Sequence, residues 1–385
     1  MKIEENQISN EAPRLGVRGG RDYSVDILRC LSCFMVVALH ASWLCMPQRM
    51  GVVEAGSFEW YGMALYRTIF ASPTVLFVMV SGIFFLTPER NVTPRKIWTK
   101  NVPKMTCAYI FWCLIYALYR IYQMDPQPEF TFKLLVQQWL IEPDHLWYIP
   151  MIVTLYILVP FFRCVTKIAD KKLYKYMLML FVPALVLNTI ATTPHLVYGG
   201  YLNTILGKTP LETICTYGFW MIYGYFMYTY RPSPKARKII YVLGVISAIA
   251  AFIICIVTYH TTGYWHAAAV NRKFTITTFG KNTAIFVFIT NHFSQIQLSD
   301  RGKKILGKVS GCTLMIYLAH WLFLEIFFDH NFIFSWGINP WIVVWIYAIV
   351  IYAIGIAMAL IFQLVPWKKL RKQIWGKITG NTESK

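Results

Sequence analysis

The chain has 385 residues, of which 57% are hydrophobic and only 14% are charged, and its mean hydropathy is +0.47. Soluble domains carry charge on about a quarter of their residues, so this composition excludes an ordinary soluble protein. The formal net charge of +19 would suit a nucleic-acid-binding protein, but the basic residues are spread over many short segments instead of one folded domain. We therefore expect no nucleic-acid partner, and we expect the lipid bilayer with its anionic headgroups to be the partner of these charges.

Ten apolar runs have about the length that crosses a bilayer. They are residues 27–46, 69–87, 104–122, 145–163, 174–192, 213–230, 238–258, 275–294, 312–329 and 341–366. Lys281 and Asn282 make the eighth run the least apolar in character. The sequence thus predicts an all-α, polytopic membrane helix bundle of about ten transmembrane helices. We expect residues 1–20 to be a disordered cytoplasmic N-terminus, 21–370 to be the transmembrane domain and 371–385 to be a basic cytoplasmic tail.

Lys and Arg fall unevenly on the two sides of this predicted bundle. The segments on the side of the N-terminus hold 28 of the 37 basic residues, and the opposite side holds seven. Because cytoplasmic loops of membrane proteins carry an excess of Lys and Arg, this asymmetry predicts that both termini are cytoplasmic.

The first run carries two ionisable side chains, Arg29 and His40, although such groups are rare inside membranes. Eleven residues at about 100° each place both on one helical face, about 16 Å apart along the axis. An imidazole there is a candidate general base, or a structural group that hydrogen-bonds between helices. An arginine at a helix mouth suits a phosphate-bearing ligand. Asp26, one turn before Arg29, offers a local ion pair as the alternative.

The second run and the loop after it carry two further signals. Ser81-Gly82 lacks the glycine spacing of a nucleophile elbow, so the pair predicts close helix packing. A basic cluster follows, which could hold the phosphates of a nucleotide-containing donor or serve only as a topology signal. Its members are Arg90, Arg95, Lys96, Lys100 and Lys104.

Two later runs also carry histidine. His145 opens the fourth run beside Trp147, where it is either functional or part of an interfacial aromatic belt. His320 lies in the ninth run, with Tyr317 about one turn earlier and Glu325 beyond it, and such a polar stripe is not expected to face lipid. Its spacing allows either a catalytic role or an interhelical network.

Cys30 and Cys33 have the spacing of a redox or zinc motif, but no second ligand pair is nearby in the sequence. We expect them to be small packing residues, and we expect no metal.

Asp26, Arg29 and His40 form an Asp-x-x-Arg-x10-His pattern, through which the chain resembles the acyltransferase-3 family of multispanning membrane O-acyltransferases. The Ser-Gly pair of the second run also resembles this family. The His-Leu-Trp-Tyr segment at 145–148 and the Tyr-Leu-x-His segment at 317–320 resemble its envelope-glycan-modifying subgroup and related serine racemase membrane domains. Where the family often has Arg-x-x-Arg at the entry to the third helix, this chain has Asn101 and Lys104, so only one positive charge is kept.

The resemblance implies a multi-pass protein of the bacterial cell membrane. It would move an acyl group, in the first instance acetyl from cytoplasmic acetyl-coenzyme A, to a hydroxyl of an envelope glycan or its lipid-linked precursor. His40 would be the catalytic base or a covalent acyl carrier; the sequence leaves both open. The implied substrate-binding residues are Arg29, Asp26, Lys104, His145, Tyr317 and His320. A transporter or flippase for a small amino acid or glycan is the alternative function. A structural scaffold would leave unexplained why Arg29 and His40 share one face of the first run.

Overall fold

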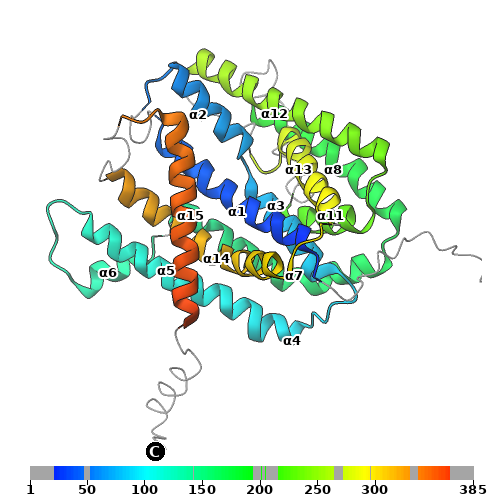
Figure 1. Ribbon diagram of the computed structural model, residues 1–385, viewed down its shortest axis with the longest axis horizontal. Coiled ribbons are helices and arrows are strands. Elements are labelled where there is room, and N and C mark those ends of the chain that lie inside the picture. The colour runs from blue at the N-terminus through cyan, green and yellow to red at the C-terminus, as the bar shows by residue number, and fades with distance from the viewer. Residues whose placement is uncertain are drawn as a thin grey trace, which may run out of the picture.

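The structure is a computed structural model that describes residues 21–46, 53–141, 143–193, 201, 204, 216–263, 272–294, 296–329 and 337–364. The expected disordered N-terminus and basic tail lie outside these residues. The described part is helical and contains no strand (Figure 1). Its main helices are α1 (Tyr23–Leu44), α2 (Phe58–Ile69), α3 (Pro73–Leu86), α5 (Val102–Tyr122), α6 (Phe132–Trp139), α7 (Tyr148–Ile168), α8 (Lys171–Thr192), α11 (Tyr217–Thr229), α12 (Pro234–Thr262), α13 (Ile276–His292), α14 (Asp300–Asp329) and α15 (Pro340–Leu364). Short helical turns, α4 (Pro94–Lys96), η1 (Ile97–Asn101) and η2 (Asp144–Trp147), precede α5 and α7.

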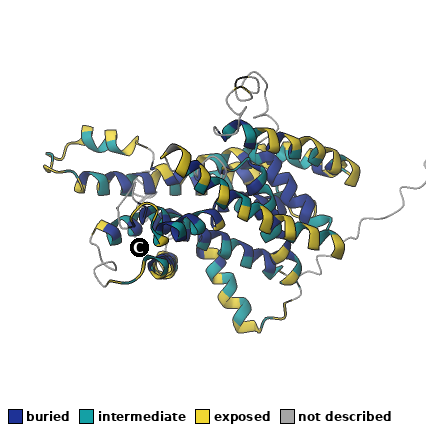
Figure 2. Ribbon diagram, turned by 90° about the horizontal axis from the view of Figure 1, so that it is seen from above, coloured by how far each residue is buried: buried dark blue, intermediate teal, exposed yellow. Residues whose placement is uncertain are grey.

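All ten predicted runs coincide with a helix, and the all-α polytopic bundle is confirmed. Eight helical segments of the described chain are long and apolar enough to cross a membrane. The other two predicted spans are α11, with 13 residues, and α13, with 17 residues. These lengths correspond to about 20 and 26 Å, less than the roughly 30 Å of a hydrocarbon core. Most of α11 is buried. Figure 2 shows buried residues gathered inside the bundle and exposed residues on its outer helices.

The second predicted run, 69–87, begins too early. It includes residues 70–72, where the structure has a break between two helices. Ser72 adopts a left-handed backbone conformation with φ of 56°, and Pro73 starts α3. Proline fits the first helical position because that position needs no amide donor. The break separates α3 from α2, a helix that sequence analysis did not predict.

Helix α1 lies at the centre of the bundle, packed against α2, α3, α13, α14 and α15. The N-terminal side of the bundle is defined here as the end at which α1 begins, and the far side as the end at which it finishes. Helices α3 and α11 approach unusually closely. A Cβ on Gly82 would lie 1.9 Å from the Met221 carbonyl oxygen, and one on Gly224 would lie 2.4 Å from Met79. The prediction of close packing at Ser81-Gly82 is therefore confirmed.

Candidate active site

Arg29 lies on the side of α1 that faces α3 and α14. Its guanidinium lies 5.7 Å from the centre of the Phe84 ring, and its Nη2 donates to Thr313 Oγ1 at 3.5 Å. The expected local pair with Asp26 is not formed. Arg21 instead donates two hydrogen bonds to the Asp26 carboxylate, at 2.5 and 2.8 Å. This pairing with Asp26 raises the pKa of Arg21 and leaves the charge of Arg29 available to a ligand.

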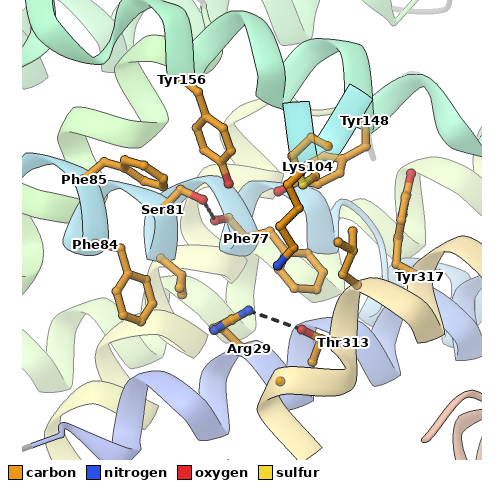
Figure 3. A pocket seen from close by; sticks show the side chains of 14 residues that line it. Arg29, Phe77, Ser81, Phe84, Phe85, Lys104, Tyr148, Tyr156, Thr313 and Tyr317 are labelled. Carbon is orange, nitrogen blue, oxygen red and sulfur yellow. Dashed lines mark hydrogen bonds between the residues drawn. The ribbon is translucent and has the colours of Figure 1, made fainter. Parts of the chain in front are cut away.

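A cavity of about 350 Å³ opens beside this guanidinium; we refer to it as the Arg29 cavity. Figure 3 shows Lys104 and Arg29 pointing into it from opposite walls, with tyrosine side chains above them. Its lining includes these two cations and, among the described residues, no acidic side chain, while its remaining walls are largely aromatic and aliphatic. The lining residues used below are Arg29, Ser81, Lys104, Tyr148, Tyr156 and Tyr317. Such a cavity suits an elongated ligand that has an apolar portion and phosphates.

Farther along α1, His40 contacts His320 of α14. The two rings stack with centroids 5.0 Å apart, and His40 Nδ1 lies 2.8 Å from His320 Nε2. His320 Nδ1 in turn hydrogen-bonds to the backbone carbonyl oxygen of Tyr317. His320 has 0% exposure, whereas His40 is half-buried.

These contacts assign the tautomers of both rings. A carbonyl oxygen can only accept, so His320 Nδ1 carries the proton, and its Nε2 in the neutral ring is an acceptor. His40 Nδ1 must then donate to it. His40 Nε2 consequently carries the lone pair, which is the arrangement that a general base needs. The hydrogen-bond partner that orients the His40 ring is thus a second histidine.

His145, in the turn before α7, completes a three-histidine cluster with the same two residues. Its ring meets the His320 ring edge-on at 5.3 Å and stacks on Trp321 at 5.7 Å. It is 5% exposed, and neither ring nitrogen makes a regular hydrogen bond with the described residues, although the Leu318 carbonyl lies nearby. The backbone carbonyl of His145 accepts a hydrogen bond from Tyr317 Oη, which ties α14 to the start of α7.

A second cavity, of about 270 Å³, lies on the far side of the cluster; we refer to it as the His40 cavity. Its polar lining consists of His40, Arg67, Ser72, Thr74, His145, Arg272 and Lys273. Lys273 Nζ lies 3.1 Å from the centre of the Trp147 ring, and burial lowers the pKa of Lys273 to about 8. Tyr317 lines both this cavity and the Arg29 cavity. Its side chain is therefore part of the wall between them. His40, which lines the second cavity, is linked to Tyr317 through the hydrogen bonds of His320.

The structure places the sequence-predicted residues as follows. Lys104 and Arg29 share one cavity, and His145 joins His40 in the other. His320 lines neither of these cavities but forms a hydrogen bond with His40. Asp26 lines a smaller cavity, of about 160 Å³, on the N-terminal side of the bundle. The predicted substrate contacts of these residues stay predictions.

Sequence analysis missed three basic residues that line the His40 cavity, Arg67, Arg272 and Lys273. All three fall in far-side segments, where they entered only the charge count. The available signal was that few basic residues occur on that side, and that these three lie close to apolar, aromatic runs.

Comparison with known families gives one finding. The sequence model of the acyltransferase-3 family, described as an acyltransferase domain, matches residues 22–360. The chain therefore belongs to this family and is a multi-pass membrane acyltransferase. Comparisons with curated proteins and with solved structures give no match.

Proposed function

We propose that this acyltransferase moves an acetyl group from cytoplasmic acetyl-coenzyme A to a hydroxyl of a bacterial cell-envelope glycan or its lipid-linked precursor, as in the envelope-glycan-modifying subgroup. The observation that carries the proposal is the placement of His40, with its lone pair on Nε2, beside the wall that two cavities share. One cavity is available for a donor and the other for an acceptor.

The Arg29 cavity suits the donor. Coenzyme A is polyanionic at one end, and its pantetheine arm is slender and mostly uncharged. Arg29 and Lys104 would contact the phosphates, while the aromatic wall formed by Tyr148 and Tyr156 would surround the arm. The distance from Arg29 to His40, about 16 Å along α1, matches an extended arm whose thioester ends at Tyr317.

The proposed topology agrees with this assignment. The N-terminal side of the bundle carries most of the basic residues, and basic loops remain in the cytoplasm. The Arg29 cavity would then face the compartment that contains acyl-coenzyme A. The His40 cavity would face outward, toward envelope glycans.

The chemistry follows from the orientation of the imidazole. His40 Nε2 removes the proton from the acceptor hydroxyl as its oxygen attacks the thioester carbonyl. The new C–O bond forms and the C–S bond breaks. The proton held by His40 then passes to the departing coenzyme A thiolate, which restores the free base. The hydrogen bond from His40 Nδ1 to His320 stabilises the imidazolium that forms between these steps, as the orienting residue does in a catalytic triad.

The direct test measures release of coenzyme A thiol by purified protein in lipid nanodiscs, with acetyl-coenzyme A and an envelope-glycan extract. Mass spectrometry of the extract should show a gain of acetyl groups on glycan hydroxyls. Donor consumption without any acetylated glycan, or consumption only with a longer acyl donor, would contradict the proposal. A radiolabelled acetyl group retained on the protein in the absence of acceptor would identify His40 as a covalent carrier instead of a base.

A further inference from the structure

The His40 cavity carries more positive charge than a neutral sugar would require. Its lining includes Arg67, Arg272 and Lys273, and the described residues contribute no Asp or Glu to it. A fourth basic side chain lies close behind the cavity, because Lys281 of α13 donates through Nζ to the backbone carbonyl of Thr68, the residue after Arg67. Cationic clefts with apolar walls concentrate anions.

Two of these cations are held against aromatic rings. Lys273 Nζ faces Trp147, and the Arg67 guanidinium lies 3.9 Å from the centre of the Trp43 ring. Such placement removes part of the water around each cation, and a bound anion would replace that hydration with charge-assisted hydrogen bonds. The low pKa of Lys273 has the same origin in burial.

The other walls of the cavity also suit an anion. Ser72, Pro73 and Thr74 line it at the start of α3, and the N-terminus of a 14-residue helix favours negative charge. His145 supplies a buried imidazole without a regular hydrogen bond. That ring can donate to an oxygen of the ligand while His40, on the opposite helix, meets its hydroxyl.

We infer that the acyl acceptor is anionic, and that the His40 cavity binds its phosphate or carboxylate through Arg67 and Lys273 while the reacting hydroxyl faces His40. This inference rests on the proposed function and names the chemical class of the acceptor. A neutral glycan would offer these cations no charge-assisted hydrogen bond in a partly apolar cavity. The donor phosphates would occupy the Arg29 cavity, on the other side of Tyr317.

The test compares binding of two probes that carry similar sugar hydroxyls, glucose 1-phosphate and methyl glucoside, to the full-length protein in nanodiscs by calorimetry. We expect glucose 1-phosphate to bind at least tenfold more tightly. Lys273→Gln and Arg67→Gln should each weaken its binding about tenfold or more, as expected for loss of a charge-assisted hydrogen bond. Lys133→Gln, which removes an exposed far-side cation on α6, is the matched control and should bind like the parent. Binding of glucuronate, measured in the same way, distinguishes recognition of a carboxylate from recognition of a phosphate.

Several results would overturn the inference. These are equal affinity for the two probes, no measurable binding of the phosphate and carboxylate probes, or unchanged binding in a folded Lys273→Gln protein. Lys273 lies in the segment before α13 and not within a helix, so this variant keeps the test decisive if Arg67→Gln does not fold. A higher KM for acetyl-coenzyme A in either variant would assign the cavity to the donor instead.

Transfer assays separate this inference from the proposed function. Acetylation of methyl glucoside as fast as of glucose 1-phosphate would refute the anionic acceptor while supporting acyl transfer. Specific binding of glucose 1-phosphate through Arg67 and Lys273, without transfer to any hydroxyl, would contradict the proposed function and support the anion site.

Discussion

The hydrogen bond between His40 and His320 predicts a specific pair of mutant phenotypes. His320→Leu keeps an apolar side chain of similar size but removes the acceptor for the His40 Nδ1 proton. His320→Gln keeps an acceptor, because an amide oxygen can reach the position that Nε2 occupies. We therefore expect the leucine variant to be impaired and the glutamine variant to recover a large part of the activity.

The size of the effect follows from the cost of a buried, unsatisfied donor. When His40 takes up the proton, its Nδ1–H group becomes part of an imidazolium, and leaving that group without its acceptor costs the transition state about 1–3 kcal/mol. Because each 1.4 kcal/mol corresponds to a tenfold change, kcat in His320→Leu should fall by roughly 5- to 150-fold. The KM for acetyl-coenzyme A should change little, since His320 lines neither the Arg29 cavity nor the His40 cavity.

The assay is steady-state release of coenzyme A thiol, normalised to the folded fraction from a thermal melt of the same preparation. A structural histidine would lower the melting temperature and spare kcat per folded molecule. Full kcat in folded His320→Leu, or equal loss in the leucine and glutamine variants, would refute the orienting role of His320.

Three further predictions concern binding, packing and topology. Arg29→Lys keeps the charge but loses the planar fork, so the KM for acetyl-coenzyme A should rise several-fold with kcat less affected; an unchanged KM would remove Arg29 from the donor site. Gly82→Ala forces a Cβ into the Met221 carbonyl and should destabilise the fold by about 1–3 kcal/mol. Gly311→Ala, where nothing lies within 4 Å of the added Cβ, should leave the stability unchanged, and thermal melts of the two variants measure the difference. Impermeant thiol labelling in intact cells, in a cysteine-free background, should modify Glu54→Cys but not Lys304→Cys; the reverse pattern would invert the proposed topology.

The helices could be predicted from the sequence because a bilayer imposes length and hydropathy on each span. All ten runs proved helical, including the one containing Lys281. The break at Ser72 was not predicted, because it depends on a single left-handed residue within a continuous apolar stretch. The predicted partner of Asp26 was also wrong. Spacing favoured Arg29 at i+3, but Arg21, just before the helix, donates both hydrogen bonds.

Only part of the candidate site could be predicted from the sequence. The helical repeat alone places Arg29 and His40 on one stripe of α1. No local pattern predicts that His320, 280 residues later, hydrogen-bonds His40, since that contact depends on how α1 and α14 pack. The cations Arg67 and Lys273 were obscured for a related reason. They come from two separate far-side segments, and only the folded bundle shows that they share a cavity.

The central claim is that His40 is the base that activates the acceptor hydroxyl. The most direct test is the rate of acetyl transfer by His40→Ala, with acetyl-coenzyme A binding and thermal stability measured on the same nanodisc preparation. Loss of a general base costs about 10²- to 10⁴-fold in rate, so transfer should fall by that factor while the donor Kd stays near that of the parent. Transfer at close to the parental rate by a well-folded His40→Ala protein would contradict the account.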